Sequence, residues 1–122
     1  MAVEPKIKVM LAEDDQSMQS VLCTLLEIEG FDVLSPPVRA SQEELINFIR
    51  SERPDVVLLD YHLGDISGLD VLRGVREDPA ISNTRVIMTS GMDMQSRCQA
   101  AGADGFILKP FMPDELIQKL RG

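Results

Sequence analysis

Acidic and basic residues follow three short apolar runs of the chain, and their types suit phosphoryl chemistry. Glu13-Asp14-Asp15, Asp60 and Lys109-Pro110 each stand directly after such a run. Each run is short enough to be a buried strand. Parallel strands of an α/β sheet deliver their last residues to one edge, outside which ligands bind. The spacing therefore predicts that these carboxylates and one ammonium converge on a divalent cation and a phosphoryl group.

A cluster of carboxylates needs positive charge nearby. Two carboxylates a few ångströms apart repel by about 1 kcal/mol in water and about 4 kcal/mol at an effective dielectric near 20. Lys109 offsets part of this repulsion, and we expect a hard cation, Mg²⁺ or Mn²⁺, to offset the rest, since these ions prefer oxygen ligands. Zinc is disfavoured, because the chain has one His and no Cys near the acidic residues.

Each residue of this set has an expected role. A carboxylate can attack phosphorus and form an aspartyl phosphate, and Asp60 is the best nucleophile because it ends the central strand. Glu13 and Asp14 would hold the metal from the neighbouring strand. Lys109 would neutralise a phosphoryl oxygen as a compact point charge. Ser90, at the end of the predicted fourth strand, offers a hydroxyl to another phosphoryl oxygen.

The elements that must position these residues alternate without a break. Gly30 ends the first helix, Ser41 to Glu44 is a capping box that opens the second, and Pro54 ends that second helix. Short connections between alternating elements predict parallel, right-handed crossovers. We predict strands at 6–12, 31–35, 55–60, 85–90 and 105–108, and helices at about 16–29, 42–53, 68–77, 92–101 and 114–121.

This alternation predicts an α/β fold, a flavodoxin-like doubly wound five-stranded parallel sheet with five helices. A sheet of this size commonly has the strand order 2-1-3-4-5, with its switch point between strands 1 and 3. Asp14 and Asp60 would meet there. The first helix is expected to pack its apolar i, i+3, i+4 positions on the sheet, namely Met18, Val21, Leu22, Leu25 and Leu26.

Length and composition limit the classes of protein. With 122 residues, 44% apolar and 26% charged, the chain suits a single domain spanning 1–122. It contains no apolar run of membrane-spanning length and no signal-peptide pattern at its N-terminus, so we expect a cytoplasmic protein without membrane contact. A net charge of −8 argues against direct nucleic-acid binding. Cys23 and Cys98 are expected to be reduced packing residues.

Four segments, taken together and in order, resemble the response-regulator receiver domain of two-component signalling, a CheY-like domain. The resemblance covers essentially the whole chain. The matching segments are Ala12 to Asp15, Leu58 to Leu63 with Gly68 downstream, Val86 to Gly91, and Ala101 to Phe111.

The resemblance implies that Asp60 accepts a phosphoryl group from a phosphohistidine. The donor partner would be a histidine kinase or a histidine phosphotransfer protein, and the downstream effector is not readable from the sequence. By the same resemblance, Asp14 binds Mg²⁺ directly, Glu13 holds it mainly through water, and the His62 backbone carbonyl is a further ligand. Such a domain is not an enzyme, beyond catalysing its own phosphorylation and dephosphorylation.

The resemblance also implies a switch. Ser90 takes the place of the family's switch Thr or Ser, and Phe106 the place of its switch aromatic residue. Lys109-Pro110 would carry the family's cis peptide bond, which is essentially a proline feature.

Two assignments have an alternative. The acidic pair is either Glu13-Asp14 or Asp14-Asp15; we favour the first, because Met18 then falls at the inward position of the first helix and Asp15 can cap that helix. Thr89 competes with Ser90 for the hydroxyl role. Counting along the strand favours Ser90 and packs Thr89 behind the strand.

The chain departs from the family pattern in two places. Leu63-Gly64 stands where the family often has Met-Pro, which predicts a more mobile loop at 61–67. Only ten residues, 92–101, separate Gly91 from Gly102. The family pattern has about three more, nearly one helical turn. The output face is therefore expected to differ. The His62 side chain is either a solvated loop residue or tunes the lifetime of the aspartyl phosphate.

Other functions remain to be weighed. A haloacid-dehalogenase-type phosphatase also uses an Asp nucleophile and Mg²⁺, but it usually needs a second acid two residues later, where this chain has His62. A receiver-like interaction module that is never phosphorylated is the main alternative. The receiver is either a stand-alone protein or part of a longer one, and the kinase, the output and the oligomeric state are not readable.

Overall fold

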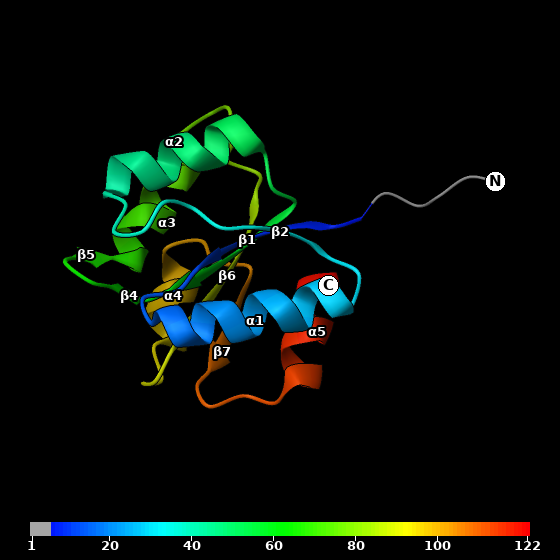
Figure 1. Cartoon of the computed structure of the whole chain (residues 1–122). Helices are drawn as coiled ribbons and strands as arrows, with labels where there is room; N and C mark the ends of the chain where they lie inside the picture. The colour runs from blue at the N-terminus through cyan, green and yellow to red at the C-terminus, as the bar shows by residue number, and fades with distance from the viewer. Residues whose placement is uncertain (1–5) are drawn as a thin grey trace.

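Five parallel strands form the centre of the fold, in the order β2-β1-β3-β6-β7 (Figure 1). The computed structural model describes residues 6–122; residues 1–5, at which the sequence shows no signal-peptide pattern, lie outside the described residues. Numbered among themselves, the five strands have the order 2-1-3-4-5, so the flavodoxin-like prediction is confirmed. The strands are β1 Lys8–Ala12, β2 Asp32–Leu34, β3 Val56–Asp60, β6 Arg85–Ser90 and β7 Gly105–Leu108.

Helices cover both faces of this sheet. α1 (Gln16–Ile28) and α5 (Pro113–Arg121) pack on one face, and α2 (Gln42–Glu52), α3 (Gly68–Glu77) and α4 (Gln95–Ala100) pack on the other. In Figure 1, α1 and α5 lie side by side below the sheet, and α2 lies above it. None of the helices within residues 6–122 has the length and apolar character needed to cross a membrane.

Side-chain oxygens fix where two helices begin. Asp15 is the N-cap of α1 and accepts hydrogen bonds from Ser17 N at 2.9 Å and Met18 N at 3.2 Å. Ser41 and Glu44 form the expected capping box of α2. Such caps satisfy backbone N–H groups that no helical partner can reach. The cap role considered for Asp15 is thereby confirmed, which favours Glu13-Asp14 as the acidic pair.

The central strand β3 is buried along its whole length, as the apolar sequence indicates. Its side chains alternate between the two faces: Val56 and Leu58 pack with α1 and α5, and Val57 and Leu59 pack with α2 and α3. By the same period of two, the side chain of Asp60 lies on the face covered by α1 and α5. The alternation thus decides which strand-end residues become neighbours at the site.

The first helix buries fewer of its apolar residues than its sequence pattern predicts. Leu22 and Leu26 are buried, but Met18 is 39% exposed and Val21 is 63% exposed. The inward position expected for Met18 is therefore wrong. At 3.6 residues per turn, positions 22 and 26 face the sheet, and positions 18, 21, 25 and 28 form a neighbouring row that turns toward solvent.

The segment 61–67, which was expected to be a loop, is a small hairpin. β4 (His62–Leu63) and β5 (Ile66–Ser67) pair antiparallel, with His62 opposite Ser67. Gly64 turns the chain with a φ of 62°. Proline is fixed near −65°, so this turn requires the departure from Met-Pro that the sequence shows.

A single arginine braces the region around the short helix α4. α4 has six residues and no side-chain cap, so the helix is shorter than the expected 92–101. Arg76 of α3 donates from Nε to Gly102 O at 2.8 Å and from a terminal nitrogen to Asp104 Oδ2 at 2.7 Å. Its third nitrogen donates to the carbonyls of Ser82 and Thr84. The guanidinium thus ties the α4–β7 loop to α3.

Gly68 allows the start of α3 to lie directly on the backbone of Asp60. A Cβ at position 68 would stand 2.0 Å from Asp60 O. We expect Gly68→Ala to lower the free energy of unfolding by about 1–3 kcal/mol, because the backbone of the site must move. Urea unfolding measures the change. Gly91→Ala is the matched control, since a Cβ there meets nothing within 4 Å. Equal stability of the two variants would contradict the steric argument.

Candidate functional site

Residues from three strand ends meet at the carboxyl edge of the sheet. Lys109 Nζ lies 2.9 Å from Asp60 Oδ2, and 2.9 Å and 3.1 Å from the two oxygens of Glu13. These contacts join residues 96 and 49 positions apart in sequence. The parallel register brings them together, because β1, β3, β6 and β7 all end at this edge. The expected convergence of Glu13, Asp60 and Lys109 is present in the structure.

The three charged groups are largely removed from water. The exposed fractions of the side chains are 8% for Asp60, 5% for Glu13 and 25% for Lys109. Asp60 Oδ1 accepts a hydrogen bond from His62 N at 3.1 Å, which fixes the plane of the carboxylate. Electrostatic attraction is stronger at such buried positions than at the surface. Asp60 is therefore an oriented, poorly hydrated carboxylate beside an ammonium.

The pKa values of Glu13 and Lys109 follow from this geometry. Burial raises the pKa of Glu13, the nearby Asp60 charge adds to this, and the hydrogen bond to Lys109 only partly opposes them. Burial by itself would lower the pKa of Lys109, but its bonds to Glu13 and Asp60 outweigh that effect and raise the pKa. Lys109 is therefore firmly protonated and holds two carboxylates at once.

Asp14 lies apart from this ion-pair cluster. It is exposed, and its Oδ1 is 3.6 Å from the position that a Cβ on Gly64 would occupy, so it lies beneath the β4–β5 turn. Within residues 6–122, no three His, Cys, Asp or Glu side chains lie close enough together to hold a metal ion. The available donors, carboxylates and the His62 carbonyl, are the hard oxygens that suit Mg²⁺, which needs few protein ligands. The residues fit Mg²⁺ in donor type, while Glu13 is engaged by Lys109.

The two candidate hydroxyls differ in their surroundings. Ser90 is 1% exposed, and its Oγ accepts a hydrogen bond from Met92 N at 3.1 Å. Thr89 is 2% exposed, and its Oγ1 has no hydrogen-bond partner among the described residues. Sequence reasoning placed Thr89 behind the strand as a packing residue, but it did not identify an unpartnered hydroxyl there. The sequence carries no signal for it, because the register that pairs Thr89 with Asp60 is visible only in the structure.

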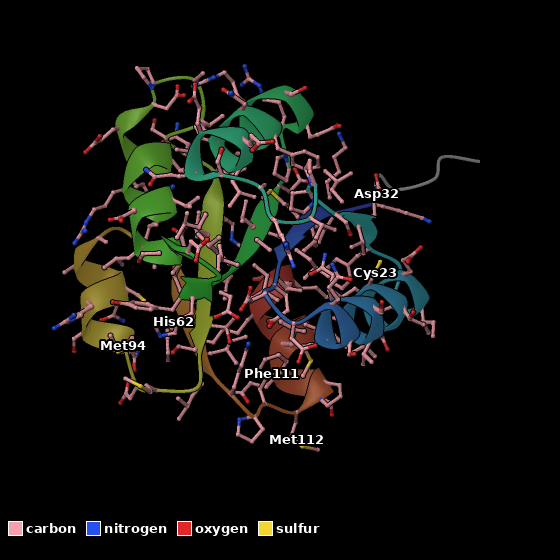
Figure 2. The ribbon with its side chains drawn as sticks, turned by 60° about the vertical axis from the view of Figure 1, so that its left-hand side comes forward. Cys23, Asp32, His62, Met94, Phe111 and Met112 are labelled. Carbon is pink, nitrogen blue, oxygen red and sulfur yellow. The ribbon has the colours of Figure 1, made fainter. Side chains whose placement is uncertain are left out.

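The remaining predicted residues lie around the same edge. Phe106 is half-buried and packs against the cluster under α3 and α4. The ring of His62 is exposed and meets the Tyr61 ring edge-on, with centroids 5.0 Å apart (Figure 2). The Lys109-Pro110 peptide bond is cis, as the resemblance implied. Cys98 is fully buried, and burial raises the pKa of its thiol, which suits a packing role.

Comparison with known families decides the class of this fold and site. The family model described as the response regulator receiver domain matches residues 9–121. The chain belongs to this receiver-domain family. The predicted resemblance is thereby confirmed, and with it the general role of the fold in two-component signalling.

The receiver domain is similar to about half of the length of several curated regulators. It is 34% identical over 93% of its length to the DNA-binding response regulator MtrA of Mycobacterium tuberculosis, covering 49% of that protein. It is 35% identical over 93% of its length to the cell cycle transcriptional regulator CtrA of Caulobacter vibrioides, covering 48% of it. The chain thus spans about half the length of the curated relatives it matches.

Solved structures show the same architecture. A putative response regulator from Chloroflexus aurantiacus superposes with a TM-score of 0.85 at 27% identity, over 96% of both chains. The receiver domain of a sensor histidine kinase from Pseudomonas aeruginosa gives a TM-score of 0.83 at 23% identity, over 96% of both chains. That second structure has a magnesium ion coordinated in its active-site cleft. Its likeness to the present chain is one of fold.

The raised pKa of Glu13 predicts a pH dependence of stability without metal. A carboxyl whose pKa is raised by folding binds its proton more tightly in the folded state, so stability falls as pH rises from about 4.5 through the folded-state pKa. The side chain in Glu13→Gln cannot ionise, so this variant does not lose stability in this way as pH rises. We expect its melting temperature, relative to wild type in chelator, to improve as pH rises from about 4.5 to about 7.

The control for this experiment is Glu77→Gln, which changes an exposed carboxylate on α3. The difference in melting temperature between Glu77→Gln and wild type should show no such improvement over the same pH range. Parallel melting curves for Glu13→Gln and wild type would contradict the assignment.

Proposed function

We propose that Asp60 accepts a phosphoryl group from a phosphohistidine on a histidine kinase or histidine phosphotransfer protein. A carboxyl oxygen of Asp60 attacks phosphorus, an O–P bond forms, and the N–P bond breaks with its electron pair returning to the imidazole. The observation that carries the proposal is the 2.9 Å contact between Lys109 Nζ and a buried, oriented Asp60 carboxylate. An ammonium group at that distance can stabilise the negative charge that develops on a phosphoryl oxygen.

The other residues of the edge have supporting roles in this proposal. Asp14, Asp60 and the His62 carbonyl would hold Mg²⁺, with Glu13 binding mainly through water. When bound, the ion supplies positive charge that offsets the charges of the carboxylates and the phosphoryl oxygens. Lys109 then exchanges its contact with Asp60 for one with the phosphoryl group and keeps its contact with Glu13. This exchange explains how one ammonium serves the site both before and after phosphorylation.

Ser90 and Phe106 form the proposed switch. Ser90 Oγ already accepts a bond from Met92 N, and its hydrogen remains available to donate to a phosphoryl oxygen. Movement of Ser90 would shift the β6–α4 loop, and Phe106 packs against the core cluster on the face of the sheet that α4 covers. The partner-binding surface would therefore change near α4 and β7. Phosphorylation and dephosphorylation would be the only reactions that the domain promotes.

An apolar surface beside the site supports a protein as the phosphoryl donor. Val21 and Ile28 of α1 are 63% and 76% exposed, and Met18 is 39% exposed in the same row. Met112, between β7 and α5, is 71% exposed, and its side chain points outward in Figure 2. Because α1 begins directly after Glu13 and Asp14, a partner helix packed on this row would bring its histidine near Asp60.

Intact mass tests the proposal directly. Incubation with Mg²⁺ and a small acyl phosphate should add one phosphoryl group to the wild-type domain and none to Asp60→Asn. A phosphohistidine donor should give the same adduct faster, because binding to a protein surface adds proximity. Absence of an adduct from folded wild-type protein would favour the second candidate, a receiver-like module that binds partners without phosphorylation.

Two neighbouring acidic residues should separate metal binding from folding. Asp14→Ala is expected to abolish measurable Mg²⁺ affinity with little change in unfolding free energy, because its carboxylate is exposed and caps no helix. Asp15→Ala removes the N-cap of α1 and should lower the unfolding free energy by about 1 kcal/mol while Mg²⁺ affinity persists. Metal titration and urea unfolding of both variants measure this. Loss of Mg²⁺ affinity in Asp15→Ala, with loss of stability in Asp14→Ala, would mean that Asp15 binds the metal and that Glu13-Asp14 is not the acidic pair.

A further inference from the structure

The hydroxyl of Thr89 is a buried polar group for which the fold provides no partner. Thr89 is 2% exposed, and Oγ1 has no hydrogen bond among the described residues. Its backbone, by contrast, is fixed, because Thr89 O accepts a hydrogen bond from Tyr61 N at 2.8 Å. A buried hydroxyl without a partner destabilises the fold that contains it. Valine has nearly the same shape and would avoid that cost, so the hydroxyl calls for a functional explanation.

The strand register places this hydroxyl beside the phosphoacceptor. Thr89 is the register partner of Asp60 across β3 and β6. Ile87, two residues before Thr89, packs in the cluster under α1 and α5, as does Leu58, two residues before Asp60. With a period of two, the side chains of Thr89 and Asp60 lie on the same face of adjacent strands, at a strand spacing of about 4.8 Å.

The side chain of Lys109 passes over the same position. Lys109 continues β7, its N donates to Ser90 O at 2.8 Å, and its Nζ reaches Asp60 on β3. Since β6 lies between β7 and β3, the lysine side chain must cross the end of β6, where Thr89 lies. In the unphosphorylated protein the ammonium therefore occupies Asp60 Oδ2, on the carboxylate that lies beside Thr89 in the register.

We infer that Thr89 Oγ1 donates a hydrogen bond to the carboxyl group of Asp60 in the phosphorylated protein and thereby shortens the lifetime of the aspartyl phosphate. This inference rests on the proposed function, in which Lys109 turns from Asp60 toward the phosphoryl group. The carboxyl group then loses its ammonium partner, and a rotation about χ1 of Thr89 supplies a donor in its place. The buried hydroxyl gains its partner only in that state.

The hydrolysis step shows why such a donor accelerates the reaction. The oxygen of a water molecule attacks phosphorus, and the O–P bond to Asp60 breaks with its electron pair returning to the carboxyl group. The water proton leaves to solvent, and inorganic phosphate departs. Negative charge grows on the carboxyl oxygens during this step, and a donor already aimed at them stabilises the transition state.

Ser90 does not provide this contact. Its side chain alternates to the other face of β6, and its Oγ accepts from Met92 N at the start of the next loop. Ser90 remains the proposed donor to a phosphoryl oxygen, whereas Thr89 serves the carboxyl oxygen. The two hydroxyls therefore act on the two sides of the O–P bond.

The test measures the lifetime of the phosphorylated domain by intact mass after removal of the donor. Thr89→Val keeps the shape and removes the hydroxyl, and we expect the lifetime to lengthen about three- to tenfold, as for the loss of one hydrogen bond. Thr89→Ser keeps a hydroxyl and should stay within about twofold of wild type. In chelator, Thr89→Val should melt at a higher temperature than wild type, because it lacks the unpartnered hydroxyl.

The outcomes separate this inference from the proposed function. Wild type that forms the adduct, with an unchanged lifetime in Thr89→Val, overturns the role of Thr89 and leaves Asp60 as the phosphoacceptor. Equal lengthening in Thr89→Ser and Thr89→Val also overturns it, since a variant that keeps the hydroxyl would then behave like one that lacks it. Absence of any adduct in folded wild type refutes the proposed function itself.

Discussion

The arrangement of the site depends on the ion pairs that one ammonium group forms with two carboxylates. Lys109 contacts Glu13 and Asp60 at 2.9 Å, at an edge where three strands deliver acidic or basic side chains. Without that ammonium, the burial of Glu13 and Asp60 would leave two repelling charges with little water to screen them. The β4–β5 hairpin, the close approach of Gly68 and the His62 N–H bond all serve to keep Asp60 in that contact.

The meeting of residues at the strand ends is predictable from the sequence, because two elementary constraints determine where those ends lie. Apolar runs of strand length must be buried, and parallel strands must end at the same edge. Together these constraints place Asp60 and Lys109 near each other without any knowledge of side-chain contacts. Asp15 and the Ser41 capping box were equally readable, since a helix start needs side-chain acceptors for its free N–H groups.

Other features depend on contacts that no local pattern encodes. The two-residue strands β4 and β5 are too short to show periodicity, so their hairpin was read as a loop. Met18 and Val21 belong to an apolar helix pattern, but only Leu22 and Leu26 of that pattern are buried against the sheet. Glu13 was expected to face a metal, and its two-oxygen contact with Lys109 emerges only when both strand ends are placed in space.

The brace formed by Arg76 links the length of a helix to the identity of a distant side chain. Its guanidinium binds the carbonyl of Gly102 and the carboxylate of Asp104 in the segment that follows the six-residue α4. A helix of that length contributes little stability of its own. An engineer who grafts a longer α4 into this scaffold must therefore redesign position 76 as well, since the loop after α4 is held by the arginine.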